Sequence, residues 1–204
     1  MCGVIGQYYF NSKEPGTAGS ISQLIQLMAR RGPDDEGLWS DNMHCTFGYR
    51  RLAILDLAPT GHQPMLTDDG RFVLVFNGEV YNFKELRAAL QQKGVVFRSS
   101  GDAEVVLYAL AEWGRDALPR FNGMFAFALY DSVRQILFCA RDRYGEKPFL
   151  YSFGADFFAF ASEYKALLQH PDISLEVDEW RLLRAAHNAS TGLLGQGDRT
   201  ANVG

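Results

Sequence analysis

The most reactive arrangement in the sequence is a cysteine at position 2, directly after Met1. Because the side chain of Cys2 is small, we expect Met1 to be removed, which leaves a thiol and a free α-amino group on one residue. A model α-amino group has a pKa of about 7.7–8.0 and a model thiol one of about 8.5, so the amine can accept the thiol proton near neutral pH. Cys2 would then supply both nucleophile and base. Taken alone, this stretch favours a plainer interpretation, a chance start to a buried strand.

Four further segments carry side chains that could bind or stabilise charge. They are Arg30–Gly37, Arg50–Arg51, Asn77–Glu79 and Gly101–Asp102. In isolation each has an ordinary structural interpretation, in order a charged helix exit, a solvated surface pair, a hairpin turn and a helix cap. A functional interpretation therefore requires that the fold bring them together.

The elements that must position these residues are mostly strands. Runs of apolar residues predict strands over 3–9, 43–49, 52–56, 72–76, 124–130, 135–140, 148–153 and 157–161. We expect the strand over 72–76 to end at Asn77-Gly78, a strong turn signal. Several of these strands are apolar without alternation, so both faces of their sheets should be covered.

Helices are predicted in two groups. Ser20 is expected to cap a helix that stops before Gly32, and Asn82 with Glu85 to form a capping box for a helix reaching residue 93. Two further helices are predicted over 102–113 and 162–168. Two packed sheets with helices outside them satisfy this pattern, so we predict an α+β fold, a four-layer α-β-β-α sandwich.

Composition excludes several classes of protein. The chain has 204 residues, 47% of them hydrophobic, which is ample for a packed core. The net charge is −4 with no basic block, so a nucleic-acid partner is not expected. We find no apolar run of membrane-spanning length and no leader, and expect a cytoplasmic protein without a membrane. The three cysteines, Cys2, Cys45 and Cys139, fit neither a disulfide framework nor a metal site.

The end of the sequence differs in character from the rest. Residues 178–186 could form one short helix, whereas 188–204 are small, polar and glycine-rich. We therefore predict one domain over 1–170 and a divergent or truncated tail over 171–204, partly disordered.

Read together and in order, several motifs resemble one known family. They are Met1–Gly6 (MCGVIG), 31–37 (RGPDDEG), 51–56 (RLAILD), 77–82 (NGEVYN), 101–104 (GDAE), 123–131 (GMFAFALYD), 141–148 (RDRYGEKP) and 160–167 (FASEYKAL). This set resembles the class II, N-terminal cysteine glutamine amidotransferase domain. Within this family, the Pro33-Asp34 pair resembles the pattern of the glutamine-hydrolysing asparagine synthetases.

The resemblance implies a fold of the N-terminal nucleophile hydrolase type and a role for each motif residue. Cys2 would attack the side-chain amide of glutamine and form a γ-glutamyl thioester, releasing ammonia. The side-chain amide of Asn77 and the backbone N–H of Gly78 would stabilise the tetrahedral oxyanion.

Three further motif residues would hold the two charged groups of the substrate L-glutamine. Arg51 has the planar fork that grips an α-carboxylate in a bidentate manner. Asp102, with help from Glu79, would bind the α-ammonium group. The role of the loop over 141–148 stays open, because it either faces a synthetase domain or is a plain charged hairpin. His62 is expected to pack beneath the site and not to take part in catalysis.

The match has a limit, because an asparagine synthetase also needs a Ser-Gly-Gly-type loop that cradles pyrophosphate, and these 204 residues contain none. We therefore expect the glutaminase half of an asparagine synthase without its synthetase half. ATP and magnesium are expected only for that missing half, so no cofactor or metal is expected here. A synthetase domain or a second copy are candidate partners. The alternatives are a non-catalytic interaction module or truncated fragment with the same fold, and a related hydrolase of another amide.

Overall fold

The computed structural model describes residues 1–11, 17–53, 58–176 and 183. The chain divides into two compact units, Met1–Ile173 and Ser174–Gly204. All the helices and strands given below lie in the first unit. The helix expected over 178–186 and the tail expected over 188–204 lie outside the described residues, except for residue 183, so both stay predictions.

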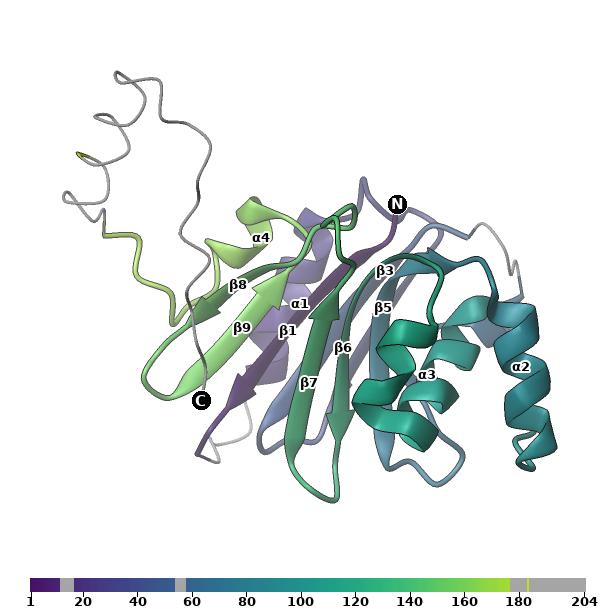
Figure 1. Ribbon diagram of the computed structural model, residues 1–204. Coiled ribbons are helices and arrows are strands. Elements are labelled where there is room, and N and C mark those ends of the chain that lie inside the picture. The colour runs from purple at the N-terminus through teal and green to yellow at the C-terminus, as the bar shows by residue number, and fades with distance from the viewer. Residues whose placement is uncertain (12–16, 54–57, 177–182, 184–204) are drawn as a thin grey trace. The chain divides into compact units, whose positions relative to one another are not determined.

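The first sheet has five strands in the order β2-β3-β1-β9-β8, each antiparallel to its neighbours (Figure 1). Their bounds are β1 Gly3–Tyr9, β2 Asp35–Ser40, β3 Cys45–Arg51, β8 Leu150–Phe153 and β9 Phe157–Ala161. The chain start enters the sheet at its central strand, since β1 pairs with β3 from Gly3 onwards. Cys2 is therefore held at the end of a strand that has neighbours on both sides.

The second sheet has four strands in the order β4-β5-β6-β7, also antiparallel. Their bounds are β4 Met65–Leu66, β5 Phe72–Val80, β6 Gly123–Asp131 and β7 Ile136–Arg141. The short β4 pairs only with Val73 and Leu74 of β5. The remainder of that edge of β5 is consequently open to side chains from other elements.

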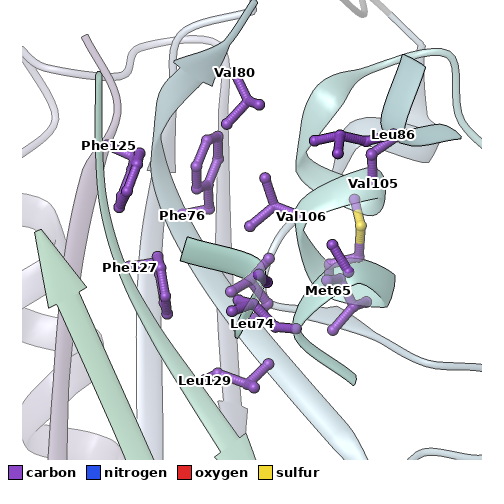
Figure 2. Packing of buried hydrophobic residues seen from close by; sticks show 14 of the residues in the cluster. Met65, Leu74, Phe76, Val80, Leu86, Val105, Val106, Phe125, Phe127 and Leu129 are labelled. Atoms are coloured by element: carbon purple, nitrogen blue, oxygen red, sulfur yellow. The ribbon is translucent and has the colours of Figure 1, made fainter. Parts of the chain in front are cut away.

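Helices cover the outer face of each sheet. α1 Thr17–Leu27 and α4 Tyr164–Leu167 contribute to one apolar cluster with β1 and β9. α2 Phe83–Gln92 and α3 Asp102–Trp113 contribute to another with β5 and β6, and Figure 2 shows Phe76 of β5 beside Val106 of α3. Two 3₁₀ turns, Pro59–Gly61 and Gly114–Arg120, complete the elements.

A third apolar cluster lies between the two sheets. Val4, Phe47 and Tyr49 from the first sheet pack in it with Val75 and Tyr130 from the second. Each sheet is thus covered on both faces, which is the condition that the unbroken apolar runs required. The predicted four-layer α-β-β-α sandwich is confirmed.

The strongest local turn signal in the sequence was misleading. Asn77 and Gly78 do not end the strand, because β5 continues through them to Val80 and stays paired with β6. A Cβ on Gly78 would lie 2.5 Å from the backbone oxygen of Met124 on β6. The glycine is therefore required for the close approach of two strands and not for a turn.

Two predicted helix caps are also wrong. α1 begins at Thr17, so Ser20 lies within the helix. The side chain of Asn82 precedes α2 without capping it. Instead, Asn82 Nδ2 donates to Arg120 O at 2.9 Å and Oδ1 accepts from Asn122 N at 3.0 Å, which ties α2 to the start of β6.

The region between α1 and β5 departs most from expectation. β2, Asp35–Ser40, was missed because its sequence has no apolar run, and its pairing with β3 supplies the stability that its composition lacks. In the strand predicted over 52–56, Leu52 and Ala53 lie outside any strand, and 54–56 lie outside the described residues. Over the part of the chain that the structure describes, no helix has the length and apolar character needed to cross a bilayer.

Candidate active site

One pocket in the first unit is lined by every site residue predicted from the sequence. They are Cys2, Arg51, Asn77, Gly78, Glu79 and Asp102. The pocket has a volume of about 110 Å³. It is formed where the start of β1, the ends of β3 and β5 and the first residue of α3 meet.

Cys2 is held at the pocket by contacts of its backbone carbonyl and of its side-chain sulfur. Its carbonyl oxygen accepts a hydrogen bond from Arg31 Nε at 3.0 Å. Its Sγ lies 3.4 Å from the backbone N of Leu52 and 3.5 Å from the carbonyl O of the same residue. Met1 N donates to Arg31 O at 3.1 Å, so the start of the chain lies beside the turn that follows α1.

The open edge of β5 presents a row of backbone donors. Phe76 N donates to Gln63 Oε1 at 2.7 Å, and Val80 N donates to Asp102 Oδ2 at 2.9 Å. Because alternate N–H groups of a strand face the same edge, the N–H of Gly78 lies between these two and points to the same side. Gly78 lines the pocket and therefore directs its N–H toward it.

The side chain of Asn77 lies on the face of β5 that is turned toward the first sheet, at the end of the space between the two sheets. It shares this face with Val75, is only 2% exposed, and lines the pocket. Its Nδ2 has no hydrogen-bond partner among the residues that the structure describes. An unpaired buried amide costs about 1–3 kcal/mol, so such groups are rare unless a ligand supplies the partner.

Arg51 lies at the end of β3 with its guanidinium largely buried. Its Nη1 donates to Ala58 O at 2.9 Å, which fixes one side of the fork. A Cβ on Gly61 would collide with Arg51 Nη2, so glycine at that position leaves room for the guanidinium. The fold places this cation within a pocket and not on a solvated surface.

Asp102 is the first residue of α3 and is 7% exposed. Burial raises the pKa of its carboxyl above the usual aspartate value, while the hydrogen bond from Val80 N opposes the shift and the nearby charge of Glu79 adds to it. Glu79, the next side chain on the Asn77 face of β5, is partly exposed. The pocket thus has a buried cation on β3 and two carboxyl groups on β5 and α3.

Several pocket residues were not predicted as site residues, among them Tyr49, Gln63 and Lys147. Tyr49 could have been found, because strand periodicity puts it on the same face of β3 as Arg51. Lys147 lies within the 141–148 motif, whose role the sequence left open. Gln63 carries no local signal, since only the tertiary structure brings it against β5.

His62 does not pack beneath the pocket as expected. Its side chain is half exposed, and its Nδ1 lies 2.7 Å from Asp35 Oδ2. The neighbouring Gln63 occupies the buried position instead, because its amide can pair with a backbone N–H of β5. Within the described ranges, no three His, Cys, Asp or Glu side chains are grouped closely enough to hold a metal ion.

A family model described as Glutamine amidotransferase domain matches residues 1–192. Among solved structures, glutamine phosphoribosylpyrophosphate amidotransferase from Bacillus subtilis, complexed with ADP and GMP, aligns with a TM-score of 0.66 at 19% identity. The alignment covers 81% of this chain and 42% of that one, and it establishes the fold alone. The chain belongs to the glutamine amidotransferase domain family and has the N-terminal nucleophile fold.

The sequence relatives narrow this assignment. Asparagine synthetase [glutamine-hydrolyzing] 3 of Bacillus subtilis is 41% identical over 180 residues, which is 87% of this chain and 29% of that protein. Amidase chry2 of Gibberella zeae is 35% identical over 178 residues, which is 82% of this chain and 26% of that protein. The chain therefore matches the glutamine amidotransferase part of glutamine-hydrolysing asparagine synthetases and spans less than a third of these relatives.

Proposed function

We propose that the pocket hydrolyses the side-chain amide of glutamine to glutamate and ammonia, with Cys2 as the nucleophile. One observation carries this proposal. A thiol, an amide nitrogen without an internal partner and an open-edge backbone N–H line the same pocket. Nucleophile and paired donors at one site are the combination that acyl transfer requires.

The reaction follows from the groups present. After Met1 is removed, the α-amine of Cys2 accepts the thiol proton, and the thiolate attacks the amide carbon of glutamine. The carbonyl electrons move onto oxygen, and collapse of this oxyanion expels ammonia, which takes the proton from the α-ammonium group. Water then attacks the γ-glutamyl thioester, which releases glutamate and restores the thiol.

In this proposal, Asn77 Nδ2 and Gly78 N–H donate to the oxyanion. Both donors belong to a strand paired along its whole length with β6, so their positions are set before substrate arrives. Donors that need no reorganisation are the effective ones, and each typically contributes about 3–4 kcal/mol to transition-state stabilisation.

The charges of the pocket suit a free amino acid. We assign the substrate α-carboxylate to Arg51 and the α-ammonium group to Asp102 with Glu79. A bidentate guanidinium and a carboxylate at fixed separation select free glutamine over a glutamine side chain within a protein.

Replacing Arg51 by lysine is expected to raise the KM for glutamine by about ten- to a hundredfold, because the charge is kept while the bidentate fork is lost. The matched control is Arg50→Lys. Arg50 binds Gly32 O and Glu36 outside the pocket lining, so its variant should retain the KM of the unmodified protein. Steady-state kinetics of both variants provide the measurement.

Asp102→Asn tests the other end of the substrate in the same assay, since an asparagine oxygen can still accept from Val80 N. Burial raises the pKa of Asp102, so its carboxylate is lost on acidification at a higher pH than an ordinary aspartate. The KM should therefore rise as pH falls through that raised value, and the variant should lose this dependence. Unchanged kinetic constants in Arg51→Lys and Asp102→Asn would show that the assigned pocket is wrong.

The protein itself is expected to form glutamate from glutamine without ATP. The assay supplies glutamine, aspartate, ATP and magnesium, and quantifies glutamate, asparagine and AMP. We propose glutamate as the product because all the groups assigned above lie within 1–102. Asparagine that appears only with ATP would contradict this assignment.

We propose no metal or cofactor for this hydrolysis, because the nucleophile, base and oxyanion donors are all protein groups. The candidate partners are a synthetase domain or a second copy of this chain. Cys2, Cys45 and Cys139 are all free thiols, which favours a reducing compartment such as the cytoplasm.

Two alternatives make different predictions. A non-catalytic module would bind glutamine or a partner without releasing ammonia. The amidase relative favours hydrolysis of another amide, in which case activity toward a glutamine derivative blocked at its α-amine would exceed that toward glutamine. The buried Arg51 and Asp102 argue for the free amino acid.

A further inference from the structure

A chain of buried hydrogen bonds runs from β5 to Tyr49, which lines the pocket together with Cys2, through residues that the mechanism above does not use. Phe76 N donates to Gln63 Oε1 at 2.7 Å, and Gln63 Nε2 donates to the Tyr49 hydroxyl at 3.1 Å. Tyr49 and Gln63 are 2% and 3% exposed. Tyr49 and Cys2 line the same pocket, and Cys2 is near enough to Tyr49 to contribute to the raised pKa of its hydroxyl.

The direction of each bond in this chain is determined by chemistry. A backbone N–H can only donate, so the side-chain oxygen of Gln63 must face Phe76 and its NH₂ group must face Tyr49. The hydroxyl oxygen of Tyr49 is thereby occupied as an acceptor. Its own proton is left for an acceptor in the pocket that Tyr49 and Cys2 both line.

We propose that Tyr49 donates a hydrogen bond to the thiolate of Cys2 and that Gln63 positions Tyr49 for this role. The proposal rests on Cys2 being the nucleophile of the proposed function. A thiolate has no proton to donate, so the Tyr49 hydroxyl and the N–H of Leu52, 3.4 Å from Sγ, become its two donors. They hold the sulfur in one orientation before glutamine binds.

The surroundings keep the tyrosine in its donating form. Burial, followed by the adjacent Cys2, raises the pKa of Tyr49 well above the ordinary tyrosine value. Tyr49 therefore retains its proton at neutral pH. It acts as a fixed donor and not as an acid or base.

Tyr49→Phe removes this donor and preserves the ring that packs between the sheets. Hydrogen bonds to charged groups contribute enough that kcat should fall by about ten- to a hundredfold, with KM changed by less than about twofold. The rate at which iodoacetamide alkylates Cys2 without glutamine, followed by mass spectrometry of the N-terminal peptide, should fall in parallel. This second readout does not depend on turnover.

The matched control is Tyr130→Phe. Tyr130 is 1% exposed in the same inter-sheet cluster, and its hydroxyl donates to Asp41 Oδ2 at 2.8 Å. Its variant loses the same kind of buried bond away from the pocket, so kcat and the alkylation rate should not change. A fall of similar size in both variants would mean that only packing is affected, and would overturn the proposal.

Gln63→Glu tests the positioning role. A carboxylate can accept from Phe76 N but offers Tyr49 only an acceptor, so the hydroxyl proton should turn away from the sulfur. We expect the loss seen in Tyr49→Phe, and no further loss in the double variant. Additive losses, or Tyr49→Phe with the original alkylation rate, would overturn the inference. Absence of glutaminase activity in the unmodified protein would instead contradict the proposed function, while the alkylation rates would still decide the role of Tyr49.

Discussion

Replacing Cys2 by serine is expected to lower the rate of glutamine hydrolysis by at least about a thousandfold, because removal of a nucleophile abolishes the covalent route. The α-amine of a serine at this position could not ionise the hydroxyl, whose acidity is far below that of a thiol. The position of residue 2 should be retained, because it depends on the backbone pairing of Gly3, the first residue of β1, and on the hydrogen bond to the carbonyl of residue 2. Loss of activity would then reflect chemistry and not folding.

The control for this variant is Cys139→Ser, which changes a free thiol on β7 outside the pocket lining and should keep the original rate. Intact mass of the active protein supplies the second measurement. Met1 must be absent, because a peptide bond at Cys2 N removes the proposed base. Full activity in a protein that retains Met1 would contradict the mechanism.

Asn77→Ala is expected to lower kcat by about a hundred- to a thousandfold with a smaller change in KM, since the lost donor acts on the oxyanion and not on the ground state. The same substitution should leave the free energy of unfolding within about 1 kcal/mol of the original. The reason is that Nδ2 of Asn77 is buried without a partner among the described residues, so removing it relieves an unmet hydrogen bond.

Asn82→Ala provides a control with the opposite pattern. The Asn82 side chain makes two hydrogen bonds, to Arg120 O and from Asn122 N, outside the pocket lining. Its loss should lower the free energy of unfolding by about 1 kcal/mol and leave kcat unchanged. Urea unfolding and steady-state kinetics of the two variants give the comparison. A strongly destabilised Asn77→Ala would show that Asn77 has a structural role instead.

The pattern of apolar residues in the sequence was sufficient to predict much of the fold. Segments rich in apolar residues predicted β1 over Gly3–Tyr9 and β9 over Phe157–Ala161 with the bounds that the structure has. The helix over Asp102–Trp113 was likewise predicted, and the need to cover both faces of the strands predicted the four layers. These features depend on burial of apolar area, which a sequence records directly as residue type and spacing.

Local turn and cap signals failed where tertiary contacts outweighed them. Asn77-Gly78 has the composition of a hairpin turn, yet pairing with β6 along β5 and the close approach of Met124 keep it extended. Asn82 is a residue type that commonly caps the start of a helix, yet its side-chain amide binds two backbone groups of the segment before β6. β2 has no strand signal of its own and exists because β3 offers it an edge.

The six candidate site residues were predicted from the order of motifs in the sequence, and their meeting at one pocket was decided by the fold. Cys2 and Asp102 lie a hundred positions apart in the chain, and only the packing of the two sheets puts both beside Asn77. The directions of the donors were likewise beyond the sequence. They follow from which edge of β5 is left open by the short β4, and from the buried Gln63 that fixes Tyr49, because hydrogen-bond direction depends on neighbours in space.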